Sequence, residues 1–198
     1  DIDALTASSI AAYDRVYDLL RARGDSGFIR RLHGDLHLGN IVLLEDNPVL
    51  FDAIEFDPLF AAGDVFYDLA FLLMDLRERG LVAAASRLFN RYLEQSGESR
   101  HLDALAALPL FLSLRAAIRA KVTAARLDVT GVSDTLRIRE SAQRYFAFAC
   151  EVLRPAVPCL VAVGGLSGTG KSLLARQLAA ALDPAPGAVV LRSDTERK

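Results

Sequence analysis

The sequence predicts a mainly α-helical lobe with one short β-hairpin, followed by the start of an α/β domain. Residues 8–153 consist mostly of segments with helical spacing of apolar residues, interrupted by two short apolar runs at 41–44 and 49–51. Two prolines then mark a linker, and the chain continues with the unbroken apolar run 159–163, which is typical of a strand in a buried parallel sheet. The expected division is a helical lobe (1–153), a linker (154–158) and the first βαβ part of a second domain (159–198).

Helices are expected where apolar residues recur every three or four positions between caps and breakers. Asp64 is placed to cap a helix that runs through Met74. Pro109 is expected to break or kink the long apolar segment that follows, and Ser133 is expected to cap the last helix of the lobe. The expected helices are 8–23, 64–74, 81–95, 102–127, 133–153 and 171–182; the expected strands are 41–44, 49–51, 159–163 and 188–191, with turns at 45–48 and 183–187.

The composition argues against several classes of protein. The 198 residues are 52% hydrophobic and 24% charged, as in a globular rather than a disordered chain. A formal net charge of −2 gives no basic surface for nucleic acid, and no apolar segment is long enough to predict a membrane span. Cys150 and Cys159 are expected to be reduced, buried thiols of a cytoplasmic protein. Because the chain lacks an initiator methionine and stops just after an expected strand, we expect it to be part of a longer protein.

The first motif places three oxygen-bearing side chains where they can meet around one metal–phosphate site. It reads His33-Gly34-Asp35-Leu36-His37-Leu38-Gly39-Asn40 and leads into the hairpin that ends at Asp52. Asp35 and Asn40 have D-x-x-x-x-N spacing, and the hairpin brings Asn40 and Asp52 side by side. In eukaryotic-type kinases this pattern supplies a catalytic base and two ligands of Mg²⁺, a metal that prefers hard oxygen ligands. Asp35 is therefore the expected base, and Asn40 and Asp52 are the expected metal ligands.

These residues also resemble the aminoglycoside phosphotransferase and choline kinase family. The resemblance spans about residues 5–150, and its specific motifs are 33–41, Phe51-Asp52-Ala53-Ile54-Glu55-Phe56-Asp57, Gly63-Asp64 and Tyr67-Asp68-Leu69-Ala70. It implies a kinase-like C-terminal lobe, with the same roles for Asp35, Asn40 and Asp52. It also implies that Asp68 is a buried carboxylate that braces the catalytic loop. The nucleotide-contacting N-terminal lobe of that fold has no counterpart in the chain, so we expect it upstream of Asp1.

Several neighbouring side chains allow two interpretations. His37 is either a ligand or a loop histidine bonded to the backbone, and we expect the latter. Glu55 and Asp57 either contact the acceptor or metal, or are solvated or paired with Arg115 and Arg119. The acidic residues that would suit a cationic acceptor are Glu55, Asp57, Asp64 and Asp68.

The second motif matches the phosphate-binding pattern G-x-x-x-x-G-K-[ST] in full, between an expected strand and an expected helix. Glycines allow backbone N–H groups to surround the β-phosphate at the helix N-terminus. Lys171 is expected to reach the β- and γ-phosphates, and Ser172 to ligate Mg²⁺. The alternative is a glycine-rich turn without nucleotide. The expected nucleotide-binding residues are Gly165, Ser167, Gly168, Thr169, Gly170, Lys171 and Ser172.

The segments 164–172 and 190–194 together resemble small P-loop kinases of metabolites and polynucleotides. That resemblance implies that Asp194 faces the acceptor hydroxyl as a base or an orienting residue. Its alternative role is a helix N-cap, and both roles are compatible. The two halves in this order resemble a bacterial two-part protein that joins an aminoglycoside-phosphotransferase-like region to a P-loop kinase.

Together the motifs predict a cytoplasmic, Mg²⁺-dependent phosphotransferase. It would move the γ-phosphate of ATP or GTP to a hydroxyl of a small molecule, with the nucleotide and the acceptor as its partners. The alternative is a degenerate kinase-like binding or regulatory module attached to a P-loop switch. The intact set of Asp35, Asn40 and Asp52 argues against degeneracy, and the missing N-terminal lobe argues for it.

Overall fold

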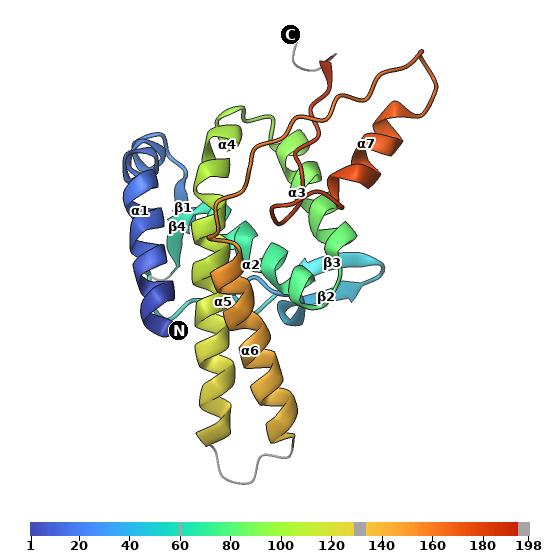
Figure 1. The fold of residues 1–198 in the computed structure, drawn as a ribbon. Coiled ribbons are helices and arrows are strands. Elements are labelled where there is room, and N and C mark those ends of the chain that lie inside the picture. The colour runs from blue at the N-terminus through green and yellow to red at the C-terminus, as the bar shows by residue number, and fades with distance from the viewer. Residues whose placement is uncertain (60, 129–133, 194–198) are drawn as a thin grey trace.

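The computed structural model describes residues 1–59, 61–128 and 134–193, which form a helical body with two small antiparallel sheets (Figure 1). The helices are α1 (Ile2–Asp25), α2 (Val65–Glu78), α3 (Val82–Ser96), α4 (Arg100–Asp103), α5 (Leu108–Ala125), α6 (Thr135–Glu151) and α7 (Lys171–Ala179). The strands are β1 (Ile29–Arg31), β2 (Ile41–Leu44), β3 (Asn47–Leu50) and β4 (Ala62–Asp64). Short 3₁₀ turns are η1 (Leu38–Asn40), η2 (Ala104–Ala106) and η3 (Arg126–Asp128).

The core lies where α2, α5 and α6 meet. α5 packs along α6 and against α2, and α3 covers another side of α2 (Figure 1). α2 is apolar around most of its circumference because neighbours surround it. The hydroxyl of Ser113 on α5 donates a hydrogen bond to the carbonyl of Ala149 on α6, at 2.8 Å, which joins the two helices inside the core. The largest fully buried apolar side chains are Phe66, Phe71, Phe89, Leu73, Met74 and Leu112.

The predicted break at Pro109 is confirmed. The segment Arg100–Ala106 and the helix after it meet at an angle of 59°. Pro109 lies in the first turn of α5, where a missing N–H costs no helical hydrogen bond. Among the described residues no single helix has both the length and the apolar composition for a membrane crossing, although this bent pair passes that test when its two parts are taken together.

The other predicted helices exist, with shifted ends. α1 begins earlier than predicted, at Ile2, because Asp1 caps it by accepting a hydrogen bond from the N–H of Asp3. α2 continues to Glu78, and α7 ends at Ala179, three residues earlier than predicted. The predicted cap Ser133 lies outside the described residues.

The hairpin forms between the predicted segments, but its tighter turn shifts the register, so Asn40 pairs with Phe51 and Asp52 is the next residue. The turn is Glu45 and Asp46 alone, with φ of 49° and 62°, so both residues are in the left-handed conformation of a two-residue hairpin loop. Pro48, which we had placed in the turn, lies in β3 opposite Leu43. In a two-residue hairpin this is a pair without backbone hydrogen bonds, so Pro48 needs no N–H there.

The sheet of β1 and β4 was not predicted. Its strands are only three residues long, too short for an alternating pattern, and residues 54–63 were expected to be irregular. The pairing places Ile29 opposite Asp64, which brings the chain before the first motif next to the start of α2. Asp64 caps α2 as predicted, because its Oδ1 accepts a hydrogen bond from the N–H of Phe66 at 2.9 Å.

The predicted strands 159–163 and 188–191 do not form. A parallel strand needs a hydrogen-bonded neighbour on its edge, and neither run has one within the described residues. The side chain of Asn90 on α3 takes that place for the second run: its Oδ1 accepts from the N–H of Val190 at 2.7 Å, and its Nδ2 donates to the carbonyl of Ala188 at 3.1 Å. In the first run, the absence of a neighbouring strand leaves Leu160 94% exposed.

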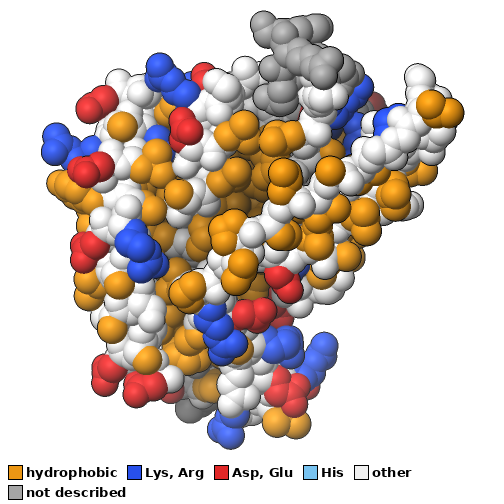
Figure 2. Space-filling model, turned by 45° about the horizontal axis from the view of Figure 1, so that its top comes forward, with side chains coloured by type: hydrophobic (Ala, Val, Ile, Leu, Met, Phe, Trp, Pro, Cys, Tyr) orange, Lys and Arg blue, Asp and Glu red, His pale blue; other side chains and the backbone are white. Residues whose placement is uncertain are grey.

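Several other apolar side chains around these runs are also exposed. Hydrophobic side chains cover much of the centre and right of the face in Figure 2, whereas charged ones lie mainly toward its margins. Both cysteines are free, as expected, but Cys159 is exposed rather than buried because its strand is absent, and Cys150 is half-buried.

Candidate active site

Two carboxylates of α2 bind the backbone of the loop 33–40. Asp68 accepts hydrogen bonds from the backbone N–H of His33 at 2.9 Å and of Gly34 at 3.1 Å. Asp75 accepts one from the N–H of Leu38 at 2.9 Å. The two carboxylates are seven residues apart, which is two helical turns, so they share a face of α2. The expected bracing by Asp68 is confirmed. Asp75 was missed, and its signal was a second acidic residue two turns along an apolar helix.

The same loop is fixed to the segment that follows the hairpin. Nε2 of His33 bonds to the carbonyl of Phe51 at 2.8 Å, and the N–H of Ile54 donates to the carbonyl of His33 at 2.8 Å. Gly34 has a φ of 81°, and a Cβ there would lie 2.8 Å from Cδ1 of Ile54. This close approach requires glycine, and it keeps the segment that contains Asp52 beside the loop 33–40.

Asp35 and Asn40 are in direct contact. Nδ2 of Asn40 donates to the backbone carbonyl of Asp35 at 3.0 Å and to its Oδ2 at 3.2 Å. Asn40 also pairs with Phe51 across the hairpin, through a hydrogen bond from the N–H of Phe51 to the carbonyl of Asn40 at 3.1 Å. Asp52 is the next residue, exposed and with a φ of 60°. The structure therefore gathers the three predicted residues at one end of the hairpin.

The oxygens that remain free suit a hard cation. Within the described residues, Oδ1 of Asn40 and the carboxylate of Asp52 accept no hydrogen bond. No group of three or more His, Cys, Asp and Glu side chains arranged for a metal occurs in the described part of the chain. The expected ligand set is of a different kind, because one of its two members is an amide. A carboxylate and an amide oxygen fit Mg²⁺ better than zinc.

His37 orients Asp35, which sequence analysis did not predict. Its Nδ1 accepts a hydrogen bond from the N–H of Gly39 at 3.0 Å, so the expected bond to the backbone is confirmed. In the neutral ring the proton is then on Nε2, which lies 3.3 Å from Oδ2 of Asp35. His37 and Asn40 thus both contact Oδ2. Oδ1 accepts no hydrogen bond within the described residues.

The acidic residues near the site do not form a common surface. Asp64 and Asp68 are buried and bonded inside the protein, so the expected acceptor surface loses two of its four members. Oδ1 of Asp57 accepts from the N–H of Leu59 at 2.8 Å, and Glu55 is exposed. Within the described part of the chain neither forms an ion pair with the two arginines of α5, so the interpretation as paired residues is wrong.

The second motif forms a loop followed by a helix, as predicted. Gly168 and Gly170 have φ of 79° and 82°, and α7 begins directly at Lys171. Nζ of Lys171 donates to the carbonyl of Leu166 at 2.5 Å, and Oγ1 of Thr169 donates to the same carbonyl at 2.8 Å. The lysine is therefore folded back onto its own loop.

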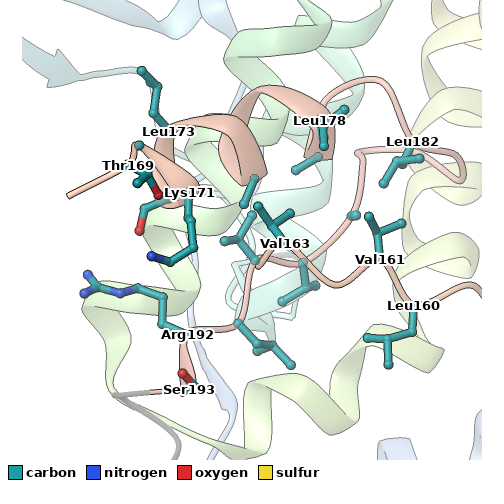
Figure 3. A pocket seen from close by; sticks show the side chains of 18 of the residues that line it. Leu160, Val161, Val163, Thr169, Lys171, Leu173, Leu178, Leu182, Arg192 and Ser193 are labelled. Carbon is teal, nitrogen blue, oxygen red and sulfur yellow. The ribbon is translucent and has the colours of Figure 1, made fainter. Parts of the chain in front are cut away.

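A cavity of about 740 Å³ lies beside this loop. In Figure 3 Lys171, Arg192 and Ser193 lie at one end of it, and Leu160, Val161 and Leu182 at the other. Gly165 is not among the lining residues, and Asp194 lies outside the described residues. The predicted nucleotide-binding residues that line the cavity are Ser167, Gly168, Thr169, Gly170, Lys171 and Ser172.

Replacing Asp68 with alanine is expected to destabilise the protein by about 1–3 kcal/mol, because two backbone N–H groups of the loop lose their acceptor. The measurement is chemical denaturation of wild type and variant. The matched control is Glu55→Ala, which removes an exposed carboxylate and is expected to change stability by no more than about 0.5 kcal/mol. Equal effects of the two substitutions would show that Asp68 does not brace the loop.

Comparison with known proteins agrees with the geometry of the first motif. A model of the phosphotransferase enzyme family matches residues 2–108, which include the loop 33–40, Asp52 and the bracing residues of α2. Proteins of Mycobacterium bovis and Mycobacterium tuberculosis, both described as uncharacterized, are each 33% identical over 181 residues. These alignments cover 91% of this chain and 34% of each relative, so the chain spans about a third of their length. Because less than a tenth of this chain is left unaligned, these alignments also extend into the part of the chain after the linker.

No solved structure matches the chain. The family match covers more than half of the 198 residues, and it carries the motifs from which the resemblance was inferred. The chain belongs to the phosphotransferase enzyme family.

Proposed function

We propose that the helical lobe transfers the γ-phosphoryl group of ATP or GTP to a hydroxyl group of a small molecule. The observation that carries this proposal is the contact of Asn40 and His37 with one oxygen of Asp35, beside Asp52 at the end of the hairpin. Two donors on Oδ2 fix the carboxylate and leave Oδ1 for the substrate. We also propose that the protein is cytoplasmic, where nucleotide and Mg²⁺ are available.

In the proposed reaction Asp35 acts as the base. Its Oδ1 accepts the proton of the acceptor hydroxyl as the hydroxyl oxygen bonds to the γ-phosphorus. The bond between the γ-phosphorus and the β–γ bridging oxygen breaks, and the nucleoside diphosphate leaves with that electron pair. Because such a reaction needs little covalent chemistry from the protein, positioning accounts for most of the catalysis. The hydrogen bonds to Asp68 and Asp75 supply that positioning by fixing the loop backbone.

Asn40 and Asp52 would hold Mg²⁺, which when bound would neutralise charge on the phosphates. The residues fit this role because their oxygens are unpaired within the described residues and lie at the same end of the hairpin. The bond from Nδ2 of Asn40 to Asp35 points the amide oxygen away from the carboxylate. Asn40 would therefore connect the base to the metal.

We also propose a second nucleotide site at Gly165 to Ser172. Its support is the complete motif, the positive φ of its glycines and the position of Lys171 and Ser172 at the start of α7. Nucleotide binding would require Lys171 to leave the carbonyl of Leu166 and turn to the phosphates. Asp194 is proposed to orient the acceptor of this second site.

Nucleotide titration of the full-length protein tests the proposal. Wild type with Mg²⁺ is expected to bind two ATP molecules per chain, and Asp52→Asn and Lys171→Ala are each expected to remove one. Transfer from γ-labelled ATP to a panel of hydroxyl compounds is measured in parallel. We expect Asp52→Asn to reduce this transfer by at least about tenfold, since it removes a charged metal ligand.

Two results would contradict the proposal. Transfer that neither substitution alters would show that neither site is catalytic. Absence of transfer, together with loss of all nucleotide binding in Lys171→Ala, would indicate that the helical lobe is a binding module attached to a nucleotide switch.

A further inference from the structure

Two arginines on one face of α5 lie against the aromatic residues of α2. Arg115 and Arg119 are four residues apart, and Arg115 is only 8% exposed. Cζ of Arg115 lies 3.9 Å from the ring centre of Tyr67 and 4.7 Å from that of Phe71. Arg119 is 5.9 Å from the ring centres of Phe71 and Tyr145. Stacking on ring faces holds both cations in place but does not use their Nε–H donors, although Arg119 also hydrogen-bonds the side chain of Tyr145.

Neither guanidinium forms an ion pair with a carboxylate in the described part of the chain. The Nε atoms of Arg115 and Arg119 are buried without a hydrogen-bond partner. Burial lowers the pKa of Arg115, and Tyr67, Asp68 and Asp35 oppose that shift. Arg23 is similarly buried but binds the carboxylate of Asp64 through two hydrogen bonds. Buried charges are normally paired. Arg115 and Arg119 therefore lack the bonded carboxylate that Arg23 has.

A continuous set of contacts connects this pair with the proposed base. Arg115 stacks on Phe71, the ring of Phe71 lies 5.5 Å from that of His37, and Nε2 of His37 is 3.3 Å from Asp35. The proposed metal ligands belong to the hairpin, whereas the arginines belong to α5, and α2 packs between these elements (Figure 1). The arginines therefore approach the catalytic loop from a different side than Asn40 and Asp52.

We propose that Arg115 and Arg119 bind an anionic group of the acceptor, a phosphate or a carboxylate. The acceptor would then be an anionic alcohol rather than the cationic compound that the acidic residues had suggested. The guanidinium fork matches both anions with paired hydrogen bonds. The inference rests on the proposed function, because it assigns the acceptor of the same reaction. The anionic group itself is unchanged in that reaction, in which only the hydroxyl of the acceptor gains the phosphoryl group.

Phosphate binding tests the site without requiring turnover. Inorganic phosphate is titrated calorimetrically into full-length protein carrying Lys171→Ala, so that the second motif does not contribute. Arg115→Gln is expected to weaken phosphate binding by about 10–100-fold, the loss of one charged hydrogen-bonding partner. The matched control is Lys121→Gln, which removes an exposed positive charge from the same helix and is expected to change affinity less than about twofold.

Arg119→Gln, at the less buried of the two positions, carries the test if Arg115→Gln fails to fold, and circular dichroism checks folding of each variant. Equal phosphate affinity of parent and arginine variants would overturn the inference, as would absence of binding by the parent.

Steady-state kinetics then assign the anion to the acceptor or to the nucleotide. Acceptors are compared in pairs that differ only by a phosphate, such as glycerol with glycerol 3-phosphate and glucose with glucose 6-phosphate. Arg115→Gln is expected to raise KM for the phosphorylated member about 10–100-fold and to leave KM for ATP unchanged. A rise in KM for ATP instead would overturn the assignment to the acceptor.

The two proposals fail in different ways. Transfer to neutral hydroxyl compounds at rates that Arg115→Gln leaves unchanged would overturn the anionic acceptor and keep the phosphotransferase. Arginine-dependent phosphate binding without transfer to any member of the pairs would overturn the phosphotransferase, and the acceptor assignment with it.

Discussion

Replacing Asp35 with asparagine is expected to lower kcat for phosphoryl transfer by about 10²–10⁴-fold, the usual contribution of a positioned general base. Asparagine keeps the size of the side chain and can still accept from Nδ2 of Asn40, but its amide cannot take the hydroxyl proton. The hydrogen bonds of the loop backbone to Asp68 do not involve the changed group. Folding and nucleotide affinity are therefore expected to stay close to wild type.

The measurement is steady-state transfer by the full-length protein, with nucleotide affinity determined separately. Asp14→Asn is the matched control, because Asp14 is an exposed aspartate on α1. A kcat for Asp35→Asn within threefold of the control would show that Asp35 is not the base. A large rise in the dissociation constant for ATP with unchanged kcat would assign Asp35 to nucleotide binding instead.

The approach of Asp35, Asn40 and Asp52 to one another could be predicted from sequence because it depends on local contacts. Asp35 and Asn40 are five residues apart, and a hairpin of either turn length brings the end of its return strand near Asn40. The turn length and the register failed, because Pro48 was expected in the turn and lies in β3. A proline suggests a turn, but the alternation of bonded and non-bonded pairs in a hairpin provides positions where a strand accepts it.

The rest of the site depends on contacts between distant segments, for which the sequence carries little signal. Asp75 reaches Leu38 across 37 positions, and Arg115 reaches Tyr67 and Phe71 from another helix. Basic residues in an apolar helix suggested an ion pair with Glu55 or Asp57, whereas aromatic faces hold them in the structure. Which partner a buried arginine finds depends on tertiary packing, and helical spacing specifies only the face on which it lies.

In the C-terminal part the error is the opposite one. The local sequence signal for a strand is strong there, but the structure contains no strand at that position. Residues 159–163 have the composition of a buried strand, yet they pair with no strand in the described part of the chain. Strand propensity reflects packing against neighbours more than an intrinsic preference of the backbone. The loop and α7 form nonetheless, because a glycine-rich turn and a helix need only local hydrogen bonds.

Replacing Arg23 with methionine is expected to destabilise the protein by about 3–5 kcal/mol, the usual cost of removing one member of a buried ion pair. Nε and Nη2 of Arg23 donate to the two carboxylate oxygens of Asp64, at 2.6 and 2.8 Å. The guanidinium also lies 4.1 Å from the ring centre of Phe28. The substitution leaves the carboxylate of Asp64 buried without its partner, and this uncompensated charge is the main source of the cost.

A double variant separates that cost from the net value of the pair. Arg23→Met with Asp64→Ser removes both charges and retains a side-chain oxygen that can cap α2 at Phe66. It is expected to be more stable than Arg23→Met alone, because burying two neutral groups costs less than burying one unpaired ion. The control is Arg91→Met, which removes one member of an exposed ion pair with Glu94 at 3.3 Å. We expect it to lower the stability by less than about 1 kcal/mol.

Chemical denaturation of the three variants shows whether Asp64 is a buried ion-pair partner of Arg23 or only a cap of α2. If Arg23→Met costs no more than Arg91→Met, Asp64 serves α2 only as a cap and its charge is solvated. If the double variant is as unstable as Arg23→Met, the loss comes from the packing of the arginine on Phe28 rather than from the unpaired carboxylate. Recovery in the double variant would show that the ion pair joins α1 to the start of α2, the helix whose carboxylates hold the catalytic loop.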